Sequence, residues 1–164
     1  VYRDELIKRL GLRGAKTIGI DPLSEKRYDD AGTLHQIDPD RCCAVRTVQV
    51  LKRALKPYAG WITGQKQFHS ADRAQLARIE WDDIYNVWKF NPLADWTAAR
   101  IESYHAQHQL PRHPLASKGY PSIGCEPCTS RVGRGEDVRA GRWRGQAKLE
   151  CGLHRNPNVI AVSS

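Results

Sequence analysis

The chain has 164 residues, which is the size of one domain or of one domain with a tail. A hydrophobic fraction of 40% and a charged fraction of 27% are typical of a globular protein, and they exclude collagen-like, low-complexity and wholly disordered chains. No apolar stretch approaches the roughly 20 residues that cross a bilayer, so we expect no membrane partner. The net charge of +8 predicts an anionic partner, which includes nucleic acids, nucleotides and acidic proteins.

The first residues are charged and lack the apolar core of a signal peptide, and the sequence contains no methionine. We therefore expect a cytoplasmic protein whose true beginning lies upstream. Its five cysteines form an adjacent pair, a C-x-x-C pair and a single residue, namely Cys42, Cys43, Cys125, Cys128 and Cys151. In a reducing compartment, thiols grouped in this way indicate metal or redox chemistry rather than disulfides.

Helical and strand-like segments alternate along the first two thirds of the chain. Helices are indicated by apolar residues three or four positions apart, and strands by short alternating runs. This alternation predicts an α/β fold. The expected helices span 2–10, 38–57 and 95–109, the last capped by Asp95; the expected strands span 15–20, 60–64 and 85–90, with polar loops over 23–37 and 65–74.

Glycine and arginine become frequent from residue 116 onward, and the apolar periodicity disappears. We therefore divide the chain into an α/β domain over 1–115 and an irregular lobe with a mobile tail over 116–164. Between Arg112 and Arg155, nine basic residues stand against four acidic ones, so this stretch carries +5 of the net charge. Something other than a large apolar core must hold the lobe together.

The paired cysteines are interpreted first as metal ligands. A C-x-x-C motif, here between Gly124 and Thr129, is a recurrent two-ligand arrangement in metal sites. Adjacent cysteines on a helix point about 100° apart, which suits zinc poorly and suits two corners of a larger cluster better. The pattern favours an iron–sulfur cluster over zinc, and small buried apolar residues remain the alternative.

Cys151 stands outside the two pairs and near the C-terminus. The basic residues Lys148 and His154 favour its thiolate form, whereas Glu150 opposes it. A thiol followed by the flexible Gly152 suits a nucleophile that must visit two places, and an exposed spare cysteine is the alternative.

Two groups of basic residues suit anion binding. Arg139 and Arg142 adjoin an indole in a glycine-bearing turn, a combination that binds planar anions and stacked bases. Lys66 and Arg73 follow the strand expected over 60–64, where α/β sheets usually bind ligands. A solvated basic surface is the alternative for both groups.

Six sequence blocks occur in the order and with the residues of one known family. They are Arg41–Arg46, Thr63–Lys66, Asn91–Leu93, Gly119–Thr129, Gly135–Trp143 and Glu150–His154. On these blocks the chain resembles, from Tyr2 to His154, the assimilatory adenylyl-sulfate reductases, which are relatives of the phosphoadenylyl-sulfate reductases. The cysteine-bearing blocks make the resemblance specific.

The resemblance implies an adenine-nucleotide α-hydrolase-like α/β fold, with residues 1–115 as its nucleotide-binding domain. It implies a 4Fe–4S cluster that supports the site without passing electrons to the substrate, held by Cys42, Cys43, Cys125 and Cys128. The implied reaction reduces adenylyl sulfate to sulfite and AMP through Cys151, with thioredoxin or glutaredoxin as electron donor. The implied substrate-binding residues are Lys66, Arg73, Arg139 and Arg142, supported by Arg46 and His154. No nucleic-acid partner is expected, and an oligomer is compatible with the pattern.

Three departures from the family pattern bear on activity. The N-terminal phosphate loop and first strand are not found, so we expect a chain that begins about a third of the way into the fold. Thr47 replaces a lysine that commonly links cluster and substrate electrostatically, and Lys66 is followed by Gln67 where a basic pair is usual. A phosphoadenylyl-sulfate reductase and a zinc-stabilised basic nucleic-acid-binding module stay open as alternatives, although the second leaves Cys151 unexplained.

Overall fold

The structure is a computed structural model that describes residues 2–70, 73–148 and 150–154. Within this part the chain packs into two compact units. We call residues 2–50 with 111–154 the cysteine unit, because all five cysteines lie in it, and residues 51–110 the sheet unit. These units follow packing, whereas the expected division at residue 116 follows composition and stays a prediction about function. No described helix is long and apolar enough to cross a membrane.

The N-terminal part of the cysteine unit is helical. Helix α1 (Tyr2–Arg9) confirms the first expected helix. The polar loop expected over 23–37 is wrong, because this stretch forms α2 (Pro22–Asp29) and α3 (Leu34–Ile37). Helix α2 begins where Asp21 accepts the backbone N–H groups of the first turn and proline occupies its first position, a start that outweighs weak apolar periodicity.

The strand expected over 15–20 is also wrong, because these residues have no regular secondary structure. A strand needs a neighbour for its backbone N–H and C=O groups, and the described sheet consists of three other segments. The short alternating run therefore joins no sheet in the part of the chain that the structure describes.

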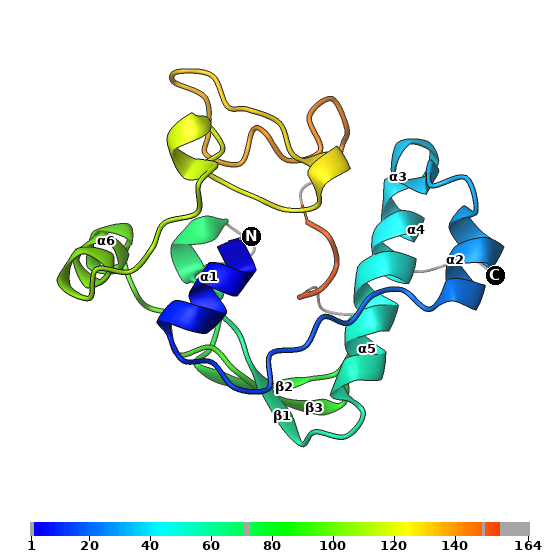
Figure 1. The fold of residues 1–164 in the computed structure, drawn as a ribbon, viewed down its shortest axis with the longest axis horizontal. Helices are drawn as coiled ribbons and strands as arrows, with labels where there is room; N and C mark the ends of the chain where they lie inside the picture. The colour runs from blue at the N-terminus through cyan, green and yellow to red at the C-terminus, as the bar shows by residue number, and fades with distance from the viewer. Residues whose placement is uncertain (1, 71–72, 149, 155–164) are drawn as a thin grey trace. The chain divides into compact units, whose positions relative to one another are not determined.

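The tandem cysteines lie on a helix that changes type directly after them. Helix α4 (Pro39–Cys43) continues into a π-helix, η1 (Ala44–Val48), and then into α5 (Gln49–Leu55), as Figure 1 shows. The Asp38 carboxylate caps the start by accepting the N–H of Arg41. The helix expected over 38–57 is thus confirmed in extent, with a widened π turn of the kind that often marks functional sites.

The sheet unit contains a mixed three-stranded sheet in the order β1-β3-β2. Strand β1 (Gly60–Ile62) runs parallel to β3 (Val87–Phe90), and β2 (Ile79–Asp82) runs antiparallel to β3. The β2–β3 hairpin was not expected from the sequence. Asp82 makes its turn by accepting the N–H groups of Ile84 and Tyr85, and the turn ends at Asn86 with a φ of 56°.

Helix α6 (Ala98–Gln107) confirms the helix expected over 95–109, with a corrected start. Thr97 is the cap, since its hydroxyl accepts the N–H of Arg100 at 3.1 Å. The expected cap, Asp95, instead forms an ion pair with Arg78 at 2.5 Å.

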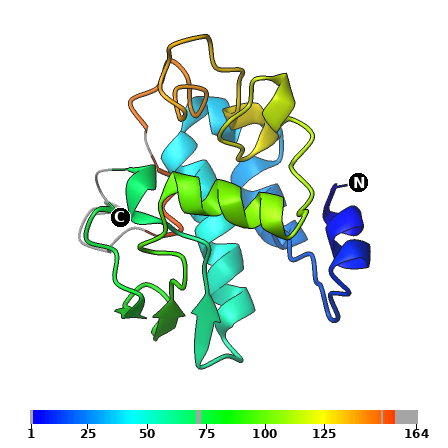
Figure 2. The ribbon, with the colours of Figure 1, turned by 90° about the vertical axis from the view of Figure 1, so that its left-hand side faces the viewer.

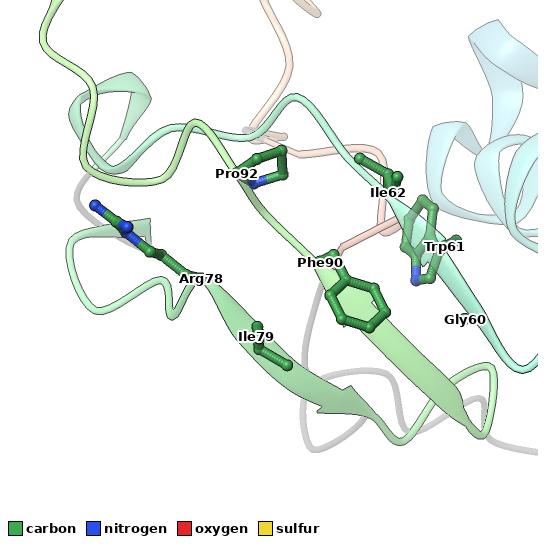
Figure 3. Close-up of a pocket in the computed structure, with 7 residues that line it drawn as sticks. All are labelled: Gly60, Trp61, Ile62, Arg78, Ile79, Phe90 and Pro92. Carbon is green, nitrogen blue, oxygen red and sulfur yellow. The ribbon is translucent and has the colours of Figure 1, made fainter.

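The two faces of the sheet differ in polarity. One face is exposed and carries large apolar side chains, namely Ile62, Ile79, Phe90, Trp81 and Trp88. The first three of these line a pocket at the ends of β1, β2 and β3 (Figure 3). The other face buries Lys89, which is 5% exposed and pairs with Glu80 at 2.8 Å. Beside this pair Asn91 is fully buried, so the interior of the unit is largely polar.

The lobe expected to be irregular is confirmed in its described residues. It consists of loops and two short 3₁₀ turns, η4 (Ala116–Lys118) and η5 (Glu126–Cys128), drawn in yellow to orange in Figure 2. Its apolar centre is Trp143, which is 4% exposed. A cross-link at its edge joins Arg144 to both carboxylate oxygens of Glu136, at 2.8 and 2.9 Å.

Candidate functional site

The tandem cysteine turn presents two buried thiols at the end of α4. Burial raises the pKa of Cys43 to about 12. Burial also raises the pKa of Cys42, assisted by the negative charges of Asp29 and Cys128. Both thiols are therefore protonated near neutral pH in the metal-free chain, and binding of a metal would release their protons.

Arg46 fixes this turn against the preceding helices. Its Nε donates to the Asp29 carboxylate at 2.7 Å and its Nη2 to Glu25 at 2.8 Å. Asp29 also accepts the N–H of Leu34 at 2.8 Å. Although burial opposes ionisation of Asp29, these two donors hold the pKa of its carboxyl below the ordinary value. Arg46 thus joins the π-helix to α2, and Asp29 joins α2 to α3.

The C-x-x-C turn is shaped by backbone and hydroxyl hydrogen bonds. The N–H of Cys128 donates to the Cys125 carbonyl at 3.0 Å, and the Thr129 hydroxyl donates to the same carbonyl at 2.8 Å. The N–H of Trp143 then donates to the Cys128 carbonyl at 3.1 Å. Burial and the nearby Cys125 raise the pKa of Cys128, while the charge of Arg142 and the Trp143 indole N–H act in the opposite direction.

The four paired cysteines are free thiols in one unit and lie close enough to influence one another's ionisation. Two thiols from a tandem pair and two from a C-x-x-C turn are a suitable donor set for a 4Fe–4S cluster. In the described part of the chain, no three His, Cys, Asp or Glu side chains lie close enough together to hold a metal ion. The cluster therefore stays a prediction that fits the donor chemistry.

Cys151 lies beside the tandem cysteine turn. It is half-buried and lies close enough to Cys43 to influence the ionisation of that thiol. The residues around it are held by two ion pairs. Lys148 donates to the Asp40 carboxylate on α4, and Nη2 of Arg139 lies 3.2 Å from Oε1 of Glu150. Cys151 is thus a partly accessible thiol outside the two pairs, and the residue before it contacts the guanidinium of Arg139.

Arg142 packs on the entrance of the C-x-x-C turn. Its guanidinium carbon lies 4.4 Å from the centre of the Trp143 ring. A Cβ atom at Gly124 would lie 2.1 Å from Nη2 of Arg142, so a side chain at this position would require the guanidinium to move. The Nε atom of Arg142 is buried and has no hydrogen-bond partner in the structure, so this side chain retains capacity for an acceptor.

Lys66 and Arg73 belong to the sheet unit, whereas Arg139 and Arg142 belong to the cysteine unit. Lys66 donates to the Gly64 carbonyl at 2.7 Å, in the loop that follows β1. Partial burial, and secondarily the positive charge of Arg73, lower the pKa of the Lys66 ammonium. That these two cations bind substrate stays a prediction.

The residues that sequence reasoning missed are the partners of these cations. Asp29 was not singled out, although it is the main acceptor for Arg46. Asp40 and Lys148 are 108 positions apart, and Arg139 and Glu150 are joined across a loop without regular structure. No local spacing indicates such pairs, so the sequence alone offered no signal for them. His154, expected to support the site, is half-buried three residues after Cys151.

The sequence is similar to those of known reductases. The sequence profile of the phosphoadenosine phosphosulfate reductase domain matches residues 1–131. The chain belongs to the phosphoadenosine phosphosulfate reductase family. A relative from Mesorhizobium japonicum, named adenosine 5'-phosphosulfate reductase, is 43% identical over 99% of this chain and 63% of its own length. One from Gloeobacter violaceus, named phosphoadenosine 5'-phosphosulfate reductase, is 50% identical over 74% of this chain and 51% of its own.

The fold agrees with this family membership. A crystal structure of phosphoadenylyl-sulfate reductase from Candida auris, in complex with phosphate, superimposes with a TM-score of 0.54 at 22% identity. It covers 79% of this chain and 64% of that one. The expected adenine-nucleotide α-hydrolase-like α/β fold is confirmed. The chain spans about half to two thirds of the length of the curated family members named above.

Proposed function

We propose that the protein reduces adenylyl sulfate to sulfite and AMP in sulfate assimilation, with Cys151 as nucleophile and a thioredoxin-type dithiol as electron donor. The observation that carries the proposal is the setting of Cys151. It is the one cysteine outside the two pairs, it is partly accessible, and it adjoins Arg139 and the tandem cysteine turn. Relatives named adenosine 5'-phosphosulfate reductase, among them the 43% identical one, support the choice of substrate.

The chemistry proceeds in two thiol steps. The Cys151 thiolate attacks the sulfate sulfur, an S–S bond forms, and the S–O bond to the nucleotide breaks so that AMP leaves with the electron pair. One thiolate of the donor then attacks Sγ of Cys151, and sulfite leaves with the electron pair of the S–S bond. The second donor thiol resolves the mixed disulfide, which returns Cys151 as a thiol and the donor as a disulfide.

The attack needs the negative charge of the sulfate oxygens to be neutralised. Guanidinium groups bind such oxyanions through paired N–H donors, and we assign this role to Arg139 and Arg142, with Lys66 and Arg73 binding the phosphate part. Arg46 is already bound by Asp29 and Glu25, so its support acts through the cysteine turn rather than on substrate. His154 has the position to assist near Cys151, three residues after it.

Cys42, Cys43, Cys125 and Cys128 would hold a 4Fe–4S cluster. Bound by these residues, such a group would cross-link the two cysteine turns and would supply a compact charged centre. The resemblance to the adenylyl-sulfate reductases, which implies a cluster on these four cysteines, supports adenylyl sulfate over its 3'-phosphorylated form. Free thiols throughout the chain are in keeping with a reducing cytoplasm and with thioredoxin or glutaredoxin as partner.

The test compares sulfite release from adenylyl sulfate and from its 3'-phosphorylated form, with reduced thioredoxin, for wild type and Cys151→Ser. We expect sulfite from adenylyl sulfate with wild type, and no turnover with Cys151→Ser at unchanged iron and sulfide content. A serine hydroxyl is far less ionised near neutral pH, which is why activity is lost. Wild-type turnover by Cys151→Ser, or a preference for the 3'-phosphorylated substrate, would contradict the proposal.

A further inference from the structure

The segment that carries Cys151 is held by two ion pairs that face different parts of the cysteine unit. Lys148 pairs with Asp40 on α4, and Glu150 pairs with Arg139 in the lobe. The side chains of Lys148 and Glu150 are 8% and 13% exposed, so neither is a freely solvated surface charge. Cys151 directly follows the second pair. Its position therefore depends on whether Glu150 stays on Arg139.

The Arg139–Glu150 pair has the chemistry of an occupied anion site. A guanidinium binds a carboxylate and a sulfate or phosphate oxygen through the same planar N–H groups. The Arg139 side chain is 21% exposed, so an incoming anion can reach it only from a limited side. An anion bound there and the Glu150 carboxylate would compete for the same donors.

The Lys148–Asp40 pair does not use the Arg139 donors, so such competition leaves it intact, although Asp40 is 77% exposed. Asp40 belongs to α4, two positions before Cys42, and none of the substrate-binding assignments involves it. The Lys148 ammonium also lies 5.7 Å from the centre of the buried Trp143 ring, a second anchor for this residue. Displacement of Glu150 would thus free Cys151 to swing while Lys148 stays attached.

We propose that Glu150 is a positioning residue that occupies Arg139 as a stand-in for the substrate anion, and that an oxyanion bound at Arg139 releases the Cys151 segment. The proposal rests on the proposed role of Cys151 as nucleophile. It adds that anion binding at Arg139 releases the segment that carries this thiol. It couples arrival of a sulfate-bearing ligand to fuller exposure of the thiol, which is half-buried when no anion is present.

The test measures alkylation of Cys151 by iodoacetamide, followed by peptide mapping, on the purified iron-loaded protein. Inorganic sulfate is the probe, and sodium chloride at equal ionic strength is the reference. Sulfate is expected to accelerate alkylation of wild type by about two- to fivefold, the range for loss of one modest ion pair. Glu150→Gln is expected to react faster from the start and to respond little to sulfate.

Three further variants make the result decisive. Arg139→Gln should also react fast and ignore sulfate, because it removes the other half of the pair. Glu150→Asp, which keeps the carboxylate, should restore part of the sulfate response. Glu5→Gln removes an equal charge from an exposed site on α1 and should behave as wild type.

Alkylation of Glu150→Gln at the wild-type rate would overturn the proposal, and so would an equal or absent sulfate effect in both proteins. These outcomes are separate from a failure of the proposed function, because alkylation reports on the Cys151 segment without substrate turnover. If adenylyl sulfate leaves no adduct on Cys151 while the sulfate response is present, the proposed function fails and the Glu150 contact stands.

Discussion

Different kinds of interaction stabilise the interior of each of the two units. In the sheet unit, backbone hydrogen bonds join three strands, and the fully buried Asn91 ties the loop after β1 to the strand ends. In the cysteine unit, segments more than one hundred positions apart meet through side chains, as in the Lys148–Asp40 pair. The sheet unit is thus organised mainly by backbone pairing of neighbouring strands, whereas the cysteine unit depends on contacts between distant side chains and contains the four paired thiols.

The largest effect should come from removing one paired thiol. Cys43→Ala is expected to lose essentially all bound iron and sulfide, because one missing corner destabilises the whole cluster. Limited proteolysis should then cut residues 111–154 first and leave 51–110 protected. Cys151→Ala is the matched control and should keep its iron. Full iron content in Cys43→Ala would contradict a role of Cys43 as a cluster ligand, and with it the claim that the cysteine unit depends on a cluster.

The next effect tests the sheet unit. Asn91→Ala should lower the free energy of unfolding by about 2–4 kcal/mol, because it leaves buried partners unsatisfied. These partners are the Thr63 hydroxyl, the Ala77 carbonyl and Glu80. Urea unfolding measures the change. Asn86→Gly, at a φ of 56° in the β2–β3 turn, should stay within about 0.5 kcal/mol of wild type. Equal effects of both would show that the buried network does not stabilise this unit.

The same contrast explains how much the sequence could predict. Helices with apolar residues at helical spacing, such as those at Tyr2–Arg9 and Ala98–Gln107, were predicted from local signals, although the cap of the second was expected at Asp95 and lies at Thr97. The strand expected over 15–20 failed because strand formation depends on a partner that no local pattern names. The residue types of the candidate site were predicted from the cysteine spacing and the family resemblance, while its ion pairs join distant positions and needed the three-dimensional structure.

A third prediction concerns the two ion pairs of Arg46, with Asp29 and with Glu25. Asp29→Asn should cost about 1–3 kcal/mol of unfolding free energy, because a buried guanidinium–carboxylate pair is broken. Glu25→Gln should cost no more than about 0.5 kcal/mol, since its side chain is 45% exposed and its pair is screened by solvent. Thermal unfolding of both variants measures the difference. If the two changes cost the same, burial of Asp29 is not what fixes the tandem cysteine turn.

The smallest expected effect is a pH dependence in the lobe. Arg144 and the N–H of Gly133 lower the pKa of Glu136 to about 2, from an ordinary 4.5. Because the folded-state pKa is depressed, the stabilisation is present above pH 4.5 and is lost as the pH falls towards 2. The stability difference between wild type and Glu136→Gln, followed by urea unfolding, should therefore shrink over this range. A difference that stays constant would rule out the Glu136 cross-link as its source.

The most direct test of the account is the intact mass of the protein after adenylyl sulfate is added without an electron donor. The division of labour among the five cysteines predicts a gain of about 80 daltons, one SO₃ group, on the only thiol that the cluster does not use. Peptide mapping should place the group on Cys151, and reduced thioredoxin should remove it as sulfite. An adduct on Cys42, Cys43, Cys125 or Cys128, or a donor-dependent release of sulfite from Cys151→Ser, would contradict the account.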